Sequence, residues 1–379
     1  HDYPVAQEEI ITFHETCVKR GTIGLYIDLV EYYCRSTSHD YTKHAMLFTS
    51  NVLGYMNTSD KHLVGRVIAA FASILGKLSI ENRWALVPRI RDAMENAGLG
   101  TPADVFLVDA MGISLYTRQV NAFTMLETKE GVKAITGVII DAILHGSLAI
   151  RQDTAFCFKY LVEFADPKAL KTEVIKICGA LIRVSNDKFP PDLKIELFLA
   201  LRLMLVKAGA MVRAMVAQLQ TTFLKAFADP QATEQVRQVV VDNLLLLVKL
   251  APKADPIIKD LSAQLDGEKV NGEQKMAVSL ALALILREKA KACNETISKA
   301  AVAVLTGIVA DGRHVNNDQI IVNSAMALAY LHCNEKGADL DAVFSKFDGL
   351  SDFRVSLGYK IGVLTSGLVK GPLEAKLFK

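Results

Sequence analysis

Apolar residues recur at helical spacing along almost the whole chain. In QVRQVVVDNLLLLVKL (235–250), Val241, Leu244, Leu245 and Val248 fall on one face of an α-helix. Sustained alternation of apolar and polar residues, which is typical of a half-buried strand, is almost absent. The pattern therefore predicts that the chain is all-α.

Short segments rich in Gly, Pro, Asn and Asp interrupt this pattern at steady intervals and predict turns. Asp-Pro, as in FADP at 164–167 and 227–230, is expected to begin a helix, because Asp can accept from free backbone amides and Pro tolerates the first helical position. Between the turns the predicted helices form consecutive pairs, which are 43–56 with 61–78, 130–144 with 148–165, 167–186 with 191–208, 210–228 with 231–250, 256–265 with 271–288, 291–309 with 316–332, and 337–348 with 352–368.

Each pair takes roughly 36 to 44 residues, which is the period of HEAT and armadillo repeats. One helical pair cannot bury its apolar face alone, so successive pairs must stack. The predicted fold is a HEAT-repeat α-solenoid, a right-handed superhelix of antiparallel helix pairs.

The segment 98–129 breaks the period. It is too long for a plain turn and too apolar for a flexible linker. We expect an irregular insertion or a degenerate repeat there, which separates N-terminal HEAT repeats (1–97) from C-terminal HEAT repeats (130–379).

A basic residue lies near the start of the second helix in six predicted pairs. We call these residues the repeat cations: Arg66, Arg151, Lys194, Arg237, Lys275 and Arg354. Arg151 and Arg237 lie in the matching triplets IRQ and VRQ. A cation at an equivalent place in each repeat is expected to bond a turn Asp and free carbonyl groups of a neighbouring repeat.

The composition and charge of the chain argue against nucleic acid and membranes as partners. Of the 379 residues, 51% are hydrophobic and only 7% aromatic, which favours packed helices and argues against a stacking platform for single-stranded nucleic acid. The net charge is +2 and the two signs are interspersed, so no long basic surface for a polyphosphate is indicated. The longest uncharged apolar runs are about half a membrane span, so no membrane association is expected.

No motif for catalysis or for a cofactor is found. The phosphate-loop, dinucleotide, nucleophile-elbow and zinc-protease patterns are all absent from the sequence. Two groups contain residue types that can bind a metal, His14 with Cys17 and the cluster Cys34, His39 and His44, but zinc ligands usually come as close pairs on turns. The six cysteines are spread without CxxC pairing and are expected to be reduced, in a cytoplasmic protein. We predict no enzyme activity, no cofactor, no metal and no small-molecule substrate.

Several stretches resemble one known family. EYYCRSTSHDYTKHA (31–45), EGVKAITGVIIDAILHGS (130–147), KICGALIRVSNDKF (176–189) and AQLQTTFLKAFADP (217–230) are similar to the C-terminal HEAT region of the general control non-derepressible protein one family. That family is a ribosome-associated activator of the kinase that phosphorylates initiation factor two alpha.

The resemblance implies a function. In the family, this region binds the RWD domain of the kinase and promotes its activation in amino-acid starvation and ribosome stalling. Other RWD proteins would compete for the same surface, and the ribosome would be contacted through the full-length protein. An arginine after QLQTTF is the family's determinant of kinase binding, and Arg237 matches it here, although Val239 stands where some relatives have a second basic residue. Arg237 is thus the predicted partner-binding residue, and the repeat pattern also gives it a structural role.

Two other functions remain as alternatives. A different HEAT adaptor, related to tubulin or transport, would share the same repeat pattern. A contact module for ribosomal RNA would use a local group of cations, for which the candidates are Arg89, Arg91, Lys207 and Arg213.

Overall fold

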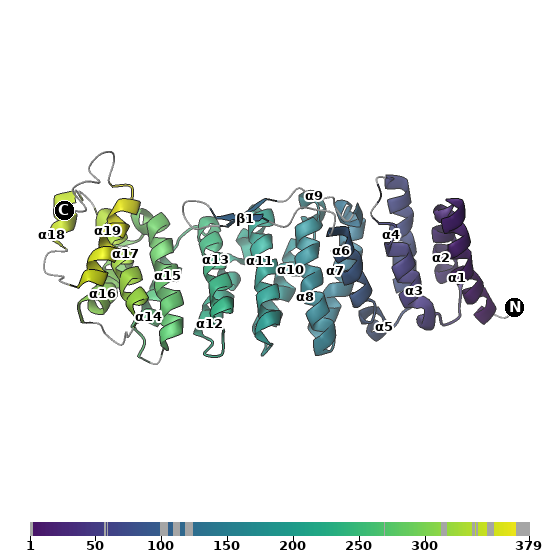
Figure 1. The fold of residues 1–379 in the computed structure, drawn as a ribbon, viewed down its shortest axis with the longest axis horizontal. Helices are drawn as coiled ribbons and strands as arrows, with labels where there is room; N and C mark the ends of the chain where they lie inside the picture. The colour runs from purple at the N-terminus through teal and green to yellow at the C-terminus, as the bar shows by residue number, and fades with distance from the viewer. Residues whose placement is uncertain are drawn as a thin grey trace. The chain divides into compact units, whose positions relative to one another are not determined.

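Nearly all of the described chain is helical in this computed structural model (Figure 1). The residues that the structure describes are 3–56, 58, 60–98, 105–108, 114–117, 124–268, 270–311, 317–335, 338, 340–346 and 352–368. The α-helices are α1 (Tyr3–Arg20), α2 (Ile23–Ser36), α3 (Thr42–Leu53), α4 (Lys61–Gly76), α5 (Ile80–Trp84), α6 (Val87–Gly98), α7 (Lys129–His145), α8 (Leu148–Phe164), α9 (Pro167–Leu170), α10 (Val174–Ser185), α11 (Pro191–Val212), α12 (Val216–Ala228), α13 (Glu234–Leu250), α14 (Asp255–Asp266), α15 (Gly272–Lys289), α16 (Glu295–Asp311), α17 (Asp318–Cys333), α18 (Leu340–Ser345) and α19 (Phe353–Thr365).

The chain divides into two compact units. Unit 1 comprises His1–Phe106 with Tyr116–Val212, and unit 2 comprises Leu107–Leu115 with Arg213–Lys379. The sequence placed a boundary in 98–129 instead. Much of that segment lies outside the described residues, so its role as a boundary stays a prediction.

In unit 1, the second helices of successive pairs pack against one another. Helix α2 packs on α4, α6 on α8, and α8 on α11, while the first helices α7 and α10 are also in contact. Within pairs, α1 packs on α2, α3 on α4, α7 on α8 and α10 on α11. A helix of each pair therefore contacts both its own partner and the next pair, which is the packing of a HEAT-like solenoid.

Unit 2 repeats this arrangement. Helices α13, α15, α17 and α19 pack in succession, and the first helices α14 and α16 contact each other. At Gly358 and Gly362 of α19 an added Cβ would lie 2.4 Å from the Val322 carbonyl oxygen and 2.8 Å from that of Met326. The two glycines thus allow α19 to approach the α17 backbone closely. The all-α HEAT-like fold predicted from the sequence is confirmed.

Several of the described helices begin where a side-chain oxygen accepts from a backbone amide, as at α4, α7, α8 and α15. Asp166 accepts from the amides of Lys168 and Ala169 directly before Pro167, as expected for Asp-Pro. The same expectation is wrong at Asp229-Pro230, because Asp229 bonds the Gln231 amide in a turn and Thr233 caps α13. Helix α13 consequently starts three residues later than predicted.

Two other predicted helices differ from the structure, and a small sheet was not predicted. The helix expected over 167–186 is divided into α9 and α10, and the one expected to start at 210 starts at Val216, because α11 and a 3-10 turn (Arg213–Met215) occupy the preceding residues. Two four-residue strands, β1 (Val105–Val108) and β2 (Ser114–Thr117), form a small two-stranded sheet. They lie in the segment 98–129, where the helical period fails, and VFLV and SLYT are too short to build a helix with a buried face.

Candidate functional site

Arg237 is fixed by the first turn of α13. The Thr233 hydroxyl accepts from the Val236 amide at 3.4 Å, and the Arg237 amide donates to the Thr233 carbonyl at 3.0 Å. Glu234 lies in the same turn, where a carboxylate is favoured by the positive end of the helix dipole. The cap and the acidic first turn place Arg237 as the fourth residue of the helix.

The Arg237 side chain joins three elements of unit 2. Its Nη2 donates to the Asp229 carbonyl oxygen at 3.3 Å, in the turn between α12 and α13. Its Nη1 donates to Glu273 Oε2 at 3.2 Å, in the first turn of α15. Its Nε has no hydrogen-bond acceptor among the described residues. The guanidinium therefore fastens its own turn to the start of the next second helix.

Exposure differs sharply between the two members of this ion pair. The Arg237 side chain is 2% exposed, whereas that of Glu273 is 74% exposed. The sequence predicted Arg237 as a partner-binding residue, and the structure buries it. The Glu273 carboxylate is therefore accessible to solvent, whereas the Arg237 guanidinium is almost fully buried.

Arg151 occupies the equivalent position in unit 1. It too is the fourth residue of its helix, α8, after a Ser147 cap that accepts from the Ile150 amide at 3.4 Å. Its Nε and Nη2 donate to the carbonyl oxygens of Gly146 and Leu144 at 2.8 and 2.9 Å, and its Nη1 lies 3.8 Å from Asp187 Oδ2. Arg151 and Arg237 thus make the same kinds of contact, with carbonyls of the preceding turn and a carboxylate of the next pair. The expected contact with a neighbouring repeat holds for the carboxylates, of which only Asp187 is a turn Asp, whereas the carbonyls belong to the cation's own pair.

The other repeat cations share this position only in part. Lys194 is the fourth residue of α11 and Lys275 the fourth of α15, where burial lowers the pKa of the Lys275 ammonium. Arg66 is the sixth residue of α4 and Arg354 the second of α19, so their predicted equivalence is wrong.

Arg66 and Arg354 nevertheless bridge neighbouring pairs. The Arg66 Nε donates to Asp28 of α2 at 2.6 Å, and the Arg354 Nη1 donates to Asp318 of α17 at 2.6 Å. In both, the carboxylate belongs to the preceding second helix, whereas Arg151 and Arg237 contact the following pair. Helix periodicity places a cation near each helix start, but the packing decides which neighbour it reaches.

Of the candidate metal ligands, Cys17 and Cys34 lie in the core of the first pairs and His14 is bonded there, whereas His39 is exposed. His14 Nε2 lies 2.9 Å from the Tyr55 hydroxyl, and Cys17 and Cys34 are buried. Burial raises the pKa of the Cys34 thiol to about 12, which keeps it protonated. No group of three His, Cys, Asp or Glu residues with metal-binding geometry occurs in the described part of the chain, and none of its helices is long and apolar enough to cross a membrane.

Several of the cations that are candidates for RNA contact interact with other groups of the chain. Arg89 lies 3.5 Å from Asp92, and Arg91 lies 2.5 Å from Asp153 with its guanidinium 4.0 Å from the centre of the Phe156 ring. The Lys207 ammonium donates to the Ala165 carbonyl at 3.1 Å. The Arg91 and Lys207 interactions join different helical pairs, whereas the Arg89 contact lies within α6, and all three reduce the positive charge available to a phosphate.

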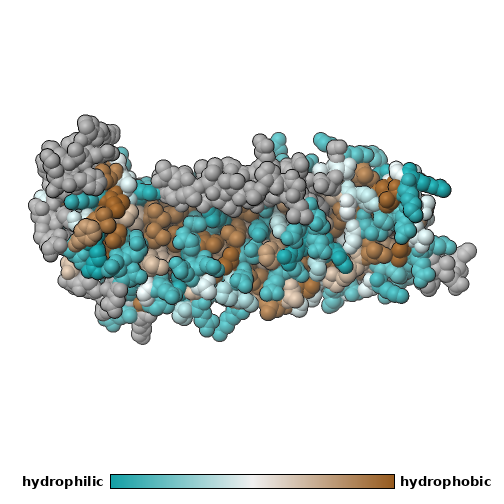
Figure 2. Space-filling view, in the orientation of Figure 1, coloured by the Kyte–Doolittle hydropathy of each residue, from teal (hydrophilic) through white to brown (hydrophobic). Residues whose placement is uncertain are grey.

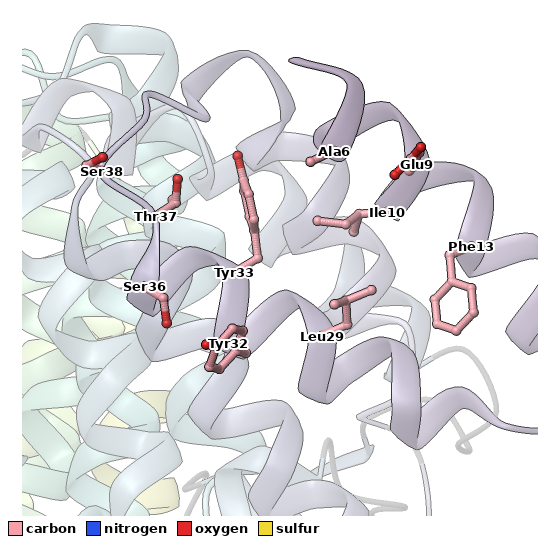
Figure 3. Close-up of a pocket in the computed structure, with 10 residues that line it drawn as sticks. All are labelled: Ala6, Glu9, Ile10, Phe13, Leu29, Tyr32, Tyr33, Ser36, Thr37 and Ser38. Carbon is pink, nitrogen blue, oxygen red and sulfur yellow. The ribbon is translucent and has the colours of Figure 1, made fainter. Parts of the chain in front are cut away.

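Sequence reasoning missed an apolar pocket of about 600 Å³ in unit 1. It lies at α1 and α2, where the side chains of Ile10 and Leu29 are seen between Phe13 and Tyr33 (Figure 3). The Tyr33 hydroxyl accepts from Gln7 at 2.9 Å. Spacing on α2 carried a signal, because Leu25, Leu29 and Tyr32 share one helix face and are all exposed.

The described part of the face seen in Figure 2 is mostly polar. On the face shown in Figure 2, hydrophilic side chains cover most of the described surface, and hydrophobic ones form patches between them.

The chain is similar in sequence to GCN1 proteins of human and yeast. It is 27% identical over 233 residues to the human stalled ribosome sensor GCN1, covering 62% of this chain and 8% of that protein. It is 22% identical over 222 residues to the eIF-2-alpha kinase activator GCN1 of Saccharomyces cerevisiae, covering 59% and 8%. The chain is a GCN1-related region.

A plant relative extends the similarity further along the chain. The Arabidopsis thaliana protein ILITYHIA is 24% identical over 323 residues, which is 85% of this chain and 11% of that protein. The chain thus spans only 8% to 11% of the lengths of these relatives. No protein-family model matches it. The GCN1 names describe sensors and activators and not enzymes.

Proposed function

We propose that this region is a non-catalytic scaffold that binds the RWD domain of the kinase phosphorylating initiation factor two alpha, and thereby promotes kinase activation during amino-acid starvation and ribosome stalling. The proposal places the protein in the cytoplasm, with the ribosome contacted through the full-length chain. The similarity to proteins named as stalled ribosome sensors and kinase activators supports it. Other RWD proteins would compete for the same surface.

Arg237 is the proposed determinant of this binding. The observation that carries the proposal is its geometry, because one buried guanidinium fastens the turn between α12 and α13 to the start of α15. Replacing it with alanine frees both elements at once. A surface assembled from two helical pairs loses its shape when that link is removed, so the substitution is expected to weaken binding at least tenfold.

The test is a calorimetric titration of the RWD domain into the purified chain, its Arg237→Ala variant and its Arg151→Ala variant. Arg151 is the matched control, because it makes the same kinds of contact in unit 1. We expect binding by the unsubstituted chain and by the Arg151 variant, and strongly reduced binding by the Arg237 variant. The absence of a complex with the unsubstituted chain overturns the proposed function.

A further inference from the structure

The first turns of α13 and α15 sort their charges by sign. Their carboxylates, on Glu234 and Glu273, are both exposed, and the Glu273 side chain is 74% exposed. Their two cations, Arg237 and Lys275, are 2% and 1% exposed. These two adjoining helix starts therefore present negative charge outward and keep positive charge inside. At the start of α17 the exposed Asp318 is instead paired with Arg354, whose side chain is 41% exposed.

The corresponding turn in unit 1 does not sort its charges in this way. In α8 the first turn carries no carboxylate, and its cation Arg151 has a side chain that is 22% exposed. Carboxylates are generally favoured at helix N-termini, but that preference does not require the neighbouring cations to be buried. The first turn of α8 thus lacks the exposed carboxylate that the first turns of α13 and α15 carry.

The Glu273 side chain is fixed in this surface by a contact with a buried residue. Its Oε2 receives the Arg237 Nη1, and the guanidinium is itself anchored on the Asp229 carbonyl. A side chain on the surface normally loses rotamer freedom when a partner binds it, which opposes binding. The buried arginine restricts Glu273 in advance, while most of the carboxylate stays open to solvent.

We infer that Glu273 is the side chain through which this surface contacts its protein partner, and that the partner presents a lysine or arginine to it. Arg237 then acts as a positioning residue, which orients Glu273 and the α12–α13 turn without touching the partner. The inference rests on the proposed function and names the contact group of that site. It also explains how a residue 2% exposed can control binding.

The test measures RWD-domain affinity for the unsubstituted chain, Glu273→Gln and Asp187→Asn. Glutamine keeps an acceptor for Arg237 but removes the negative charge. Asp187 is the matched control, because it is the exposed carboxylate paired with Arg151 in unit 1. We expect Glu273→Gln to weaken binding at least tenfold with an unchanged melting temperature, and Asp187→Asn to leave affinity unchanged. Higher salt should weaken binding by the unsubstituted chain more than by Glu273→Gln, because exposed charge pairs are screened.

The outcomes separate the two proposals. Binding by the unsubstituted chain together with equal affinity and equal salt dependence for Glu273→Gln overturns the role of Glu273 and leaves the proposed function standing. An equal loss for Asp187→Asn also overturns it, because any exposed carboxylate would then suffice. No binding by the unsubstituted chain overturns both.

Discussion

Arg237 and Glu273 link α13 to α15 through a single 3.2 Å contact in which the cation is buried and the anion exposed. Breaking this contact has different consequences on its two sides. Loss of Glu273 leaves a buried guanidinium with one acceptor fewer, whereas loss of Arg237 removes the buried charge together with its bonds to two elements. Substitutions at the two positions therefore separate the stability of unit 2 from recognition by it.

Arg237→Ala is expected to lower the free energy of unfolding by about 1 to 3 kcal/mol, because two hydrogen bonds of a charged group and its packing are lost. Urea unfolding followed by circular dichroism measures the difference. Glu273→Gln should cost less than about 1 kcal/mol, since the exposed carboxylate contributes little to folding. Equal losses for both variants would contradict this assignment of roles.

Two glycines of α19 are expected to be irreplaceable. In Gly362→Ala the new methyl group would lie 2.7 Å from the Ala329 Cβ and 2.8 Å from the Met326 carbonyl oxygen. Moving α19 away from α17 should cost about 1 to 3 kcal/mol, as for overpacked cores. Gly179 of α10 has open space around its added Cβ, so Gly179→Ala should instead stabilise the chain by about 1 kcal/mol through helix propensity. Thermal unfolding of both variants tests the contrast, and a loss of stability in Gly179→Ala would refute it.

Stability should fall in mild acid through His332. Burial, with a smaller effect of Lys346, lowers the pKa of His332 to about 4, and its Nδ1 lies 2.8 Å from the Tyr359 hydroxyl. The unfolded chain binds this proton at about pH 6.5, so the contribution is present above that pH and is lost as the pH falls to about 4. The loss amounts to about 3 kcal/mol.

The reference for this pH dependence is His332→Asn, which keeps a polar group near Tyr359 but cannot titrate. Urea unfolding of both proteins between pH 7 and pH 4 isolates the histidine, because all other groups titrate in both. The stability difference between the two proteins should shrink as the pH falls. A constant difference would show that His332 does not take up a proton in this range.

A buried polar contact joins α15 to α17. The Asn323 Nδ2 donates to the Ser279 hydroxyl at 3.1 Å, and its Oδ1 accepts from Gln319 at 2.9 Å. Asn323→Ala should lower the free energy of unfolding by about 1 to 3 kcal/mol, because Ser279 loses a buried partner. Asn323→Ala combined with Ser279→Ala should cost less than the sum of the two single changes, which a double-mutant cycle measures. Simple additivity would mean that the two side chains do not interact.

Local sequence predicted most helices because their signals are local. The spacing of Val241, Leu244, Leu245 and Val248 defines one helix face, and all four residues are buried as that face requires. Caps were harder to predict, because Asp229 and Thr233 both precede the helix and both can accept from a backbone amide. Packing of the turn selected Thr233. The two strands escaped prediction because each is only four residues long.

The sequence predicted which residue occupies the candidate site. It did not predict how buried that residue is or which side chain it contacts. The matching triplets IRQ and VRQ identified Arg151 and Arg237 as equivalent, and their contacts confirm it. Neither triplet indicates that Arg237 would be 2% exposed or that its carboxylate partner would be Glu273, 36 residues later. Those facts depend on how α13 and α15 meet.

The sequence by itself determined an all-α chain of helical pairs, since a helix face is set by residues three and four positions apart. It also determined the similarity to GCN1 proteins, which is carried by the order of residues. Only the tertiary structure decided which charges are buried, because exposure depends on neighbouring helices that are distant in the chain. The burial of Arg237 and the exposure of Glu273 are of this second kind.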